Sequence, residues 1–181
     1  GQLSDVTLNV SGGAINSVND ATGDFGIVIG RSLTFTAQNA SSINTSVSEI
    51  TGAVTGANES LTIHEEDGVL NGTGTNTPID GLLVGDSGLV ANGGDITLTV
   101  SGTGNIAGGN LTLNGVISAA GTGNAALGDV NITVENGSIT STTPADFIEA
   151  NVATISAAND SLIETRVNTI NATITGNLVL N

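Results

Sequence analysis

The sequence predicts an all-β protein, a β-solenoid in which each coil of the chain stacks its strands on those of the next coil. Apolar and polar residues alternate over runs of five or six residues, as in a strand with one buried face. These runs resemble one another, whereas the strands of a sandwich have individual surroundings. Gly and Asn dominate the turns, where left-handed backbone is needed. An antiparallel β-sandwich or jelly roll is the alternative fold.

The composition of the 181 residues excludes several classes of protein. Gly, Asn, Thr and Ser number 26, 21, 25 and 16, and the only aromatic residues are three Phe, so the core must be aliphatic. The chain has no Cys, which excludes disulfides and thiolate chemistry. A net charge of −15, with Arg31 and Arg166 as the only cations, argues against binding to nucleic acid or anionic lipid. No apolar stretch approaches the roughly 20 residues of a membrane span.

Three segments share one pattern: Asp, two apolar–polar pairs, Val, a Gly-containing turn, then Ile. They begin at Asp5, Asp95 and Asp129, and looser copies lie at 33–37 and 61–63. Alternation predicts that one face of each strand is buried and that Thr7, Thr97 and Thr133 point outward. The inward residues are Val6, Leu8, Val10, Ile96, Leu98, Val100, Val130, Ile132 and Val134.

A second repeat relates residues 152–157 to residues 167–172, fifteen positions later. The first pattern recurs at irregular separations, which indicates coils of different length. We therefore interpret residues 1–181 as a single repetitive β-solenoid segment of a longer chain or fibre. Since a coil covers its edge only with another coil, we expect covalent continuation into further repeats or end-to-end self-association.

The carboxyl-terminal segment resembles a known family. It contains Leu162 followed by Glu-Thr-Arg-Val, then Val-Asn-Thr-Ile-Asn-Ala at 167–172, then Thr-Gly-Asn-Leu at 175–178. This series is similar to a coil of filamentous-haemagglutinin-like exoproteins, the large repetitive β-helical adhesins exported by two-partner secretion or as autotransporter passengers. The more specific match covers about residues 146–181, and regions 16–60 and 72–94 fit the pattern poorly.

The resemblance implies a right-handed parallel β-helix that acts as a stalk or adhesive fibre. The expected function is a non-catalytic structural segment of a bacterial cell-surface adhesin or extracellular filament, in adhesion or a biofilm matrix, and the expected location is extracellular. Its expected ligand is a surface glycan or another host or bacterial surface molecule. The alternatives are a β-sandwich subunit that polymerises by strand donation, and a carbohydrate-binding or carbohydrate-active β-solenoid.

The residues offer little catalytic chemistry. His64 stands before Glu65, Glu66 and Asp67, a group that suits a metal corner or a general base, but a solvated turn explains it more simply. We therefore expect no enzyme activity and no organic cofactor. Structural calcium is the one ion that the carboxylates favour, with candidate ligands Asp5, Asp95 and Asp129. Each of these Asp residues opens a strand, where its carboxylate can instead accept backbone amide hydrogens.

Asn-x-Ser/Thr sequons occur more often than chance placement predicts. They indicate either a glycosylated surface protein or strands whose alternating polar positions pair Asn with Ser or Thr. The candidate asparagines are Asn9, Asn39, Asn44, Asn58, Asn71, Asn110, Asn131, Asn136, Asn159 and Asn171. Thr-x-Thr pairs at 34/36, 97/99 and 173/175 are typical of the threonine ladders of ice-binding solenoids, but the equivalent pairs Thr7/Asn9 and Asn131/Thr133 make the ladder non-uniform.

Overall fold

The structure, a computed structural model, describes residues 3–18, 26–67, 81–102, 109–122 and 126–181. This part of the chain contains thirteen strands and no helix, so the all-β prediction is confirmed. The described residues therefore include no helix that could span a membrane. The strands are β1 (Asp5–Val10), β2 (Ile27–Ala37), β3 (Ser41–Val54), β4 (Leu61–Asp67), β5 (Leu82–Ala91), β6 (Ile96–Gly102), β7 (Leu111–Leu113), β8 (Ile117–Ser118), β9 (Val130–Val134), β10 (Ile139–Ser141), β11 (Phe147–Ala157), β12 (Ser161–Ile174) and β13 (Leu178–Leu180).

All pairings between these strands are parallel, so the antiparallel sandwich or jelly roll is wrong. The hydrogen-bonded neighbours close into a barrel-like ring of nine strands, with β1, β2, β8 and β13 as additional strands. The order around this ring is β3-β4-β6-β9-β11-β12-β10-β7-β5. The ring closes because long strands such as β3 and β11 pair with different partners at their two ends.

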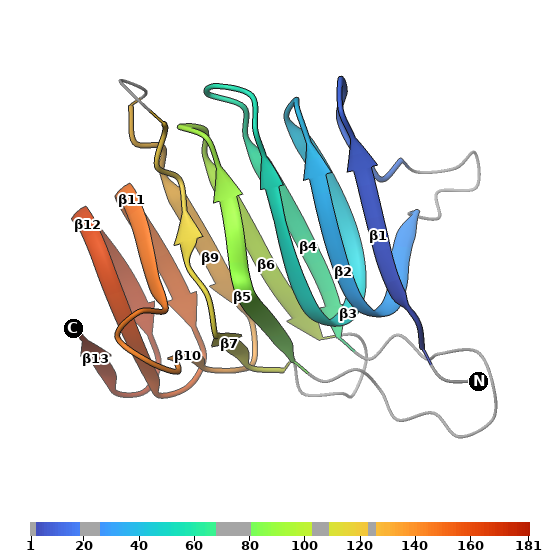
Figure 1. The fold of residues 1–181 in the computed structure, drawn as a ribbon. Helices are drawn as coiled ribbons and strands as arrows, with labels where there is room; N and C mark the ends of the chain where they lie inside the picture. The colour runs from blue at the N-terminus through green and yellow to red at the C-terminus, as the bar shows by residue number, and fades with distance from the viewer. Residues whose placement is uncertain (1–2, 19–25, 68–80, 103–108, 123–125) are drawn as a thin grey trace.

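The pairings form three rows of stacked strand segments, and from β4 onward the chain visits them in the repeating order row 1, row 2, row 3. Before β4, one strand spans rows 2 and 3, since Glu49 and Ile50 of β3 pair with residues 83 and 84 of row 2. Figure 1 shows the strands side by side, with the blue-to-red order of the sequence running along the stack. Row 1 contains 41–45, 61–65, 96–100, 130–134, 153–157 and 170–174. Row 2 contains 82–84, 111–113, 139–141, 161–163 and 178–180. Row 3 contains 5–10, 32–37, 49–54, 89–91, 117–118, 148–150 and 165–167.

One passage of the chain through the three rows, here called a circuit, varies in length without disturbing the rows. In row 1, Ala153 pairs with Ile170, 17 residues later, whereas Leu61 pairs with Ile96, 35 residues later. The extra residues lie at the corners between rows, as between β4 and β5. Most length variation therefore lies outside the stacked strands, and the exception is β5, where the register against β3 shifts between Ile50↔Val84 and Gly52↔Leu89.

The core consists of inward side chains stacked in columns along the rows. The central column of row 1 contains the buried residues Ile43, Ile63, Leu98, Ile132 and Ile155. Nine inward positions were predicted, and the six in β6 and β9 are confirmed as buried. The three in β1 are only half-buried, because β1 has a hydrogen-bonded neighbour on one side only.

A large ring fits this narrow interior at one place. Phe35 is fully buried and pairs in register with Gly52 of the next circuit. A Cβ atom at position 52 would overlap the Phe35 ring, so glycine provides the space that the ring occupies. The expectation of a purely aliphatic core is therefore wrong at Phe35.

Two predicted repeat relations differ from the observed register. The first-pattern copies stack as two separate pairs: β1 on β2 in row 3, and β6 on β9 in row 1. The second repeat was read with a period of 15 residues, but Val152 pairs with Thr169 and Ile155 with Ala172, a period of 17. A slip of two residues keeps every side chain on the same face of its strand, so alternation alone does not distinguish the two registers.

Candidate functional site

The most regular surface of the protein is the outward face of row 1. Strand alternation places two residues of each circuit on this face, and the parallel register stacks them into two columns. We call these twelve positions the row 1 face. Its first column is Ser42, Thr62, Thr97, Asn131, Thr154 and Asn171, and its second is Asn44, His64, Thr99, Thr133, Ser156 and Thr173.

The row 1 face is chemically uniform and carries no carboxylate. All of its positions except His64 are Ser, Thr or Asn, although the whole chain holds 17 acidic residues. The carboxylates nearest to it along the strands are Asp95 and Asp129, two residues before the first column, and Glu66 and Glu135, two residues beyond the second. The sequence reasoning noted the Thr-x-Thr pairs but missed this surface, because Thr34 and Thr36 lie on row 3 and the gaps in the row 1 ladder are filled by Asn and Ser.

The outward positions of the other two rows are mixed. In row 3, Glu149 pairs with Arg166, whose guanidinium lies 3.7 Å from the centroid of the Phe147 ring. In row 2, an outward column contains Leu83, Thr112, Thr140, Leu162 and Val179. Leu162 and Val179 are 38% and 50% exposed. Only row 1 therefore offers a continuous uncharged array of hydrogen-bonding groups.

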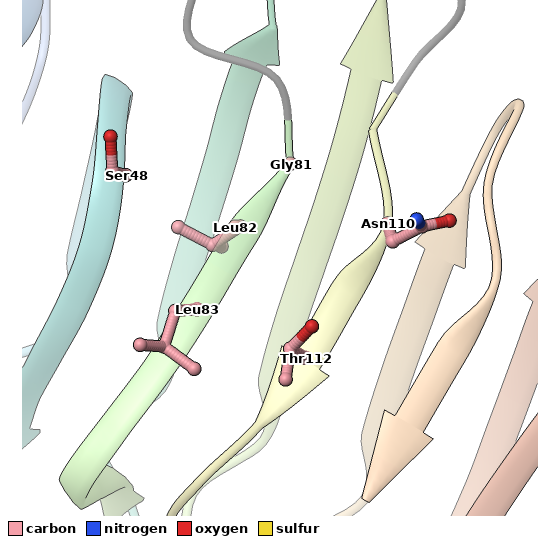
Figure 2. Close-up of a pocket in the computed structure, with 6 residues that line it drawn as sticks. All are labelled: Ser48, Gly81, Leu82, Leu83, Asn110 and Thr112. Carbon is pink, nitrogen blue, oxygen red and sulfur yellow. The ribbon is translucent and has the colours of Figure 1, made fainter. Parts of the chain in front are cut away.

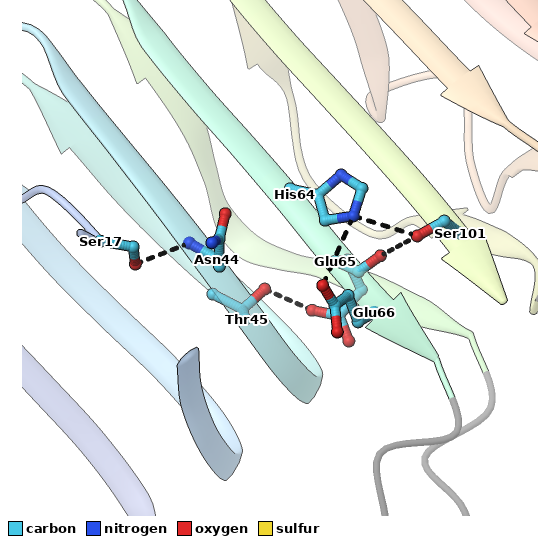
Figure 3. A network of polar contacts seen from close by, with 7 residues as sticks. All are labelled: Ser17, Asn44, Thr45, His64, Glu65, Glu66 and Ser101. Atoms are coloured by element: carbon cyan, nitrogen blue, oxygen red, sulfur yellow. Dashed lines mark hydrogen bonds and ion pairs between the residues drawn. The ribbon is translucent and has the colours of Figure 1, made fainter. Parts of the chain in front are cut away.

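A buried carboxyl group lies directly beneath the row 1 face. Glu65 is fully buried, in the inward column that continues with Val100 and Val134. Its Oε2 atom accepts a hydrogen bond from the Thr45 hydroxyl (Figure 3). Its Oε1 atom accepts one from the Val47 backbone N–H at 3.0 Å. The prediction of a solvated turn at 64–67 is wrong, because these residues belong to β4 and burial alternates along residues 61–66.

His64 does contact a serine and an acid, but not in the geometry of a catalytic triad. Its Nε2 atom lies 3.2 Å from Ser101 Oγ and 3.8 Å from Glu66 Oε1 (Figure 3). Ser101 Oγ also donates a hydrogen bond to the Glu65 backbone oxygen at 3.2 Å. A triad needs the acid on the other ring nitrogen, to orient the imidazole. Both contacts of His64 fall on one nitrogen, so Ser101 is not activated by this arrangement.

The candidate calcium ligands Asp95 and Asp129 bind backbone amides of the following circuit. Asp95 Oδ1 accepts the Asp129 N–H at 2.9 Å, and Asp129 Oδ1 accepts the Val152 N–H at 3.1 Å. Asp129 also accepts a hydrogen bond from the Asn151 side chain at 3.1 Å. Both carboxylates therefore accept backbone amide hydrogens, the alternative to calcium binding that their position predicted, and the amides belong to the next circuit. Within the described residues, no group of three or more His, Asp or Glu side chains is arranged to hold a metal ion.

We expect Asp129→Ala to lower the free energy of unfolding by about 0.5–1.5 kcal/mol, because the Val152 N–H loses its acceptor. Asp129→Asn is the control, since its amide oxygen keeps an acceptor in place. Urea unfolding followed by circular dichroism measures both changes. Addition of calcium should leave the midpoint of each variant unchanged, and a calcium-dependent rise in the wild type alone would assign Asp129 to an ion site.

Asp5, the third calcium candidate, is occupied by an ion pair. Its carboxylate accepts hydrogen bonds from Arg31 Nε at 2.8 Å, from Arg31 Nη2 and from Ser32 Oγ at 2.7 Å. The hydrogen bonds from Arg31, and then that from Ser32, lower the pKa of the Asp5 carboxyl group to about 2. Because these contacts join β1 to β2, the pair fastens the first circuit to the second.

The lowered pKa of Asp5 predicts a pH dependence of stability. The folded-state pKa of about 2 lies below the usual value of 3.8, so the stabilisation is fully present above pH 3.8 and is lost as the pH falls through 2. Asp5→Asn should therefore lower the Tm at neutral pH, and the difference in Tm from the wild type should shrink as the pH falls through 2. Thermal unfolding of both proteins from neutral pH to below pH 2 measures the difference, and a difference of constant size across this range would contradict the assignment.

The sequons divide into strand and corner positions. Asn9, Asn44, Asn131 and Asn171 lie on strands, where alternation explains the pairing of Asn with Ser or Thr two residues later. The corner positions are Asn39, Asn58, Asn110, Asn136 and Asn159, all exposed, whereas Asn71 lies outside the described residues. The Asn159 side-chain amide already donates to the Asn136 backbone oxygen at 3.0 Å. Exposed glycosylation candidates therefore lie at these five corner positions and on the strands at Asn9, Asn131 and Asn171.

Two adjoining hollows lie beside row 2 and share Ser48 and Leu83. The first, of about 260 Å³, is lined by Ser48, Gly81, Leu82, Leu83, Asn110 and Thr112. Figure 2 shows Leu83 between Ser48 on one side and Thr112 on the other. The second, of about 470 Å³, also contains Arg31, whose guanidinium is paired with Asp5. Glu49 also lines the second hollow, beside the Arg31–Asp5 pair, whereas the lining of the first hollow contains no charged residue.

No family model, no curated protein and no solved structure matches this chain.

Proposed function

We propose that this chain is a segment of a right-handed parallel β-helix that serves as a non-catalytic stalk of a bacterial cell-surface adhesin or extracellular filament. The observation that supports it is that strand segments stay stacked in rows while circuits range from 17 to 37 residues. In such a stack each circuit contacts only its neighbours, so length can grow by repetition. The right-handed winding is the hand that connections between parallel strands in one sheet almost always take.

The surface chemistry supports an extracellular location and a role in adhesion or a biofilm matrix. A charge of −15 keeps neighbouring stalks apart in solution. The exposed corner sequons suit a glycosylated surface protein. The ligand of the adhesin is a surface glycan or another molecule of a host or bacterial surface.

The partner along the axis is a further circuit, either of the same chain or of a second copy. Among the described strands, β1 pairs only with β2 and β13 only with β12, so each has one edge without a described partner. In the last circuit the inward residue Ala172 is exposed, whereas its neighbour Ile155 one circuit earlier is buried. An added circuit would cover these apolar side chains and pair the edges.

The stalk geometry is testable by small-angle X-ray scattering on one copy and on two copies fused in tandem. Strands in a sheet lie about 4.7–4.9 Å apart, so seven stacked circuits in each copy should lengthen the rod by roughly 30 Å without widening it. Two independent globules on a flexible joint would contradict the stalk. A high-resolution crystal structure tests the right-handed winding directly.

Adhesion itself is tested by displaying the chain on a non-adherent bacterium and counting cells that attach to epithelial monolayers and to abiotic surfaces. We expect more attachment than with a displayed domain of the same size and charge. Equal attachment would overturn the adhesive role. Release of sugar from a polysaccharide panel by the purified chain would instead favour a carbohydrate-active enzyme.

A further inference from the structure

The row 1 face repeats in two directions. Along the stack, neighbouring positions of one column are separated by the strand spacing of about 4.7–4.9 Å, and the two columns are two residues apart, about 6.6–6.8 Å along each strand. The register holds over all six circuits of the row. The corners absorb the differences in circuit length, so the array is not interrupted by insertions.

The side chains of this array are short and stiff. Six of the twelve are Thr, a β-branched residue with restricted χ1, and the others except His64 are Ser or Asn. Each hydroxyl or amide both donates and accepts hydrogen bonds. Their positions are fixed by strands whose opposite faces are buried, as with Thr97 and Thr99 on either side of Leu98. The array is therefore ordered before any partner arrives.

The charge and shape of the row 1 face restrict its partner. Nucleic acids and anionic lipids need basic groups, and protein partners anchor through large apolar or aromatic side chains. Apart from the single imidazole of His64, the twelve positions contain neither kind of group. They contain no carboxylate that would repel an anion or attract a cation, in a chain of charge −15. A complementary partner is uncharged, donates and accepts hydrogen bonds at every position, and repeats in two dimensions.

We propose that the row 1 face binds the surface of ice. The oxygen atoms of an ice surface repeat at spacings close to those of the array in both directions, and each oxygen atom both donates and accepts hydrogen bonds. Water molecules held between the columns would join the ice lattice, and many weak contacts would act together across six circuits. This activity is separate from the proposed adhesive function and does not depend on it.

The test measures thermal hysteresis and the fraction of protein incorporated into a slowly grown ice hemisphere. We expect thermal hysteresis and incorporation into ice for the wild-type chain. Both should be lost in the double variant Thr97→Tyr/Thr133→Tyr, which places two rings diagonally across the array. The matched control is Thr7→Tyr/Thr36→Tyr, the same diagonal on row 3, which should retain both activities. Circular dichroism and Tm establish that each variant is folded.

Thr97→Val/Thr133→Val provides a second variant that keeps the side-chain shape and removes two hydroxyl groups. We expect it to reduce hysteresis, even if the Tyr pair fails to fold. A folded wild-type chain with no hysteresis and no incorporation into ice would overturn the proposal, as would equal losses in the row 3 control. Binding to an insoluble neutral polysaccharide, or dimerisation, that is lost in the row 1 variants while ice is ignored would assign the face to that partner instead.

Discussion

Leu98→Ala is expected to lower the free energy of unfolding by about 2–5 kcal/mol, because it opens a cavity in a packed interior. Leu98 is fully buried and stacks in register between Ile63 and Ile132. Every other neighbour in this column is also aliphatic, so no polar group is available to fill the space. Urea unfolding monitored by circular dichroism gives the change directly.

The matched control for Leu98→Ala is Thr97→Ala, one residue away on the outward face of the same strand. It removes a comparable part of a side chain but opens no cavity, so it should cost within about 1 kcal/mol, the range of strand propensities. If Thr97→Ala proved the more damaging of the two, the inward and outward faces of row 1 would have to be exchanged.

Thr45→Val is expected to cost about 1–3 kcal/mol or more, because it removes a hydrogen-bond donor from the buried carboxyl group of Glu65. Glu65→Val should have a similar cost, since it leaves the Thr45 hydroxyl and the Val47 N–H without this acceptor. The double variant continues the apolar column of Val100 and Val134. Its cost should therefore be smaller than the sum of the two single changes.

The double-mutant cycle measures this coupling, which we expect at about 0.5–3 kcal/mol. Thr62→Val is the control, because it makes the same chemical change on the outward face of β4 and should stay within about 0.5 kcal/mol. Strict additivity of Thr45→Val and Glu65→Val would show that their contact contributes nothing to stability.

Much of the fold was predictable because alternation is a local property of the chain. The segments around Leu98 and Ile132 show the period of two directly, and both lie where the pattern places them. The registers were less accessible, since a slip of two residues, such as the one between 15 and 17 in β11 and β12, leaves the faces unchanged. Which segments share a row depends on the lengths of the corners, and no local pattern encodes that.

In the candidate site too, local features were predictable from the sequence and contacts between circuits were not. The position of Asp95 and Asp129 at the start of a strand predicted that their carboxylates bind backbone amides. It did not predict that these amides belong to the next circuit. Glu65 was missed because a charged residue in an acidic run is expected to face solvent. The signal that could have found it is the alternation of Leu61, Ile63 and Glu65, which continues one position past the apolar residues. Its donors Thr45 and Val47 come from another circuit and are invisible to sequence spacing.

The unequal circuits have a mechanical consequence. When the two ends of the stack are pulled apart, the load acts along the hydrogen bonds between neighbouring strands, so the chain should peel away one circuit at a time. A released circuit of 17 residues adds about 56–61 Å of extended chain, and one of 34 or 35 residues adds about twice as much. Stretching a single molecule should therefore give a sawtooth of steps with unequal spacing, the widest from the circuits with long corners. Such a tether would dissipate force gradually and shorten again circuit by circuit when the load falls.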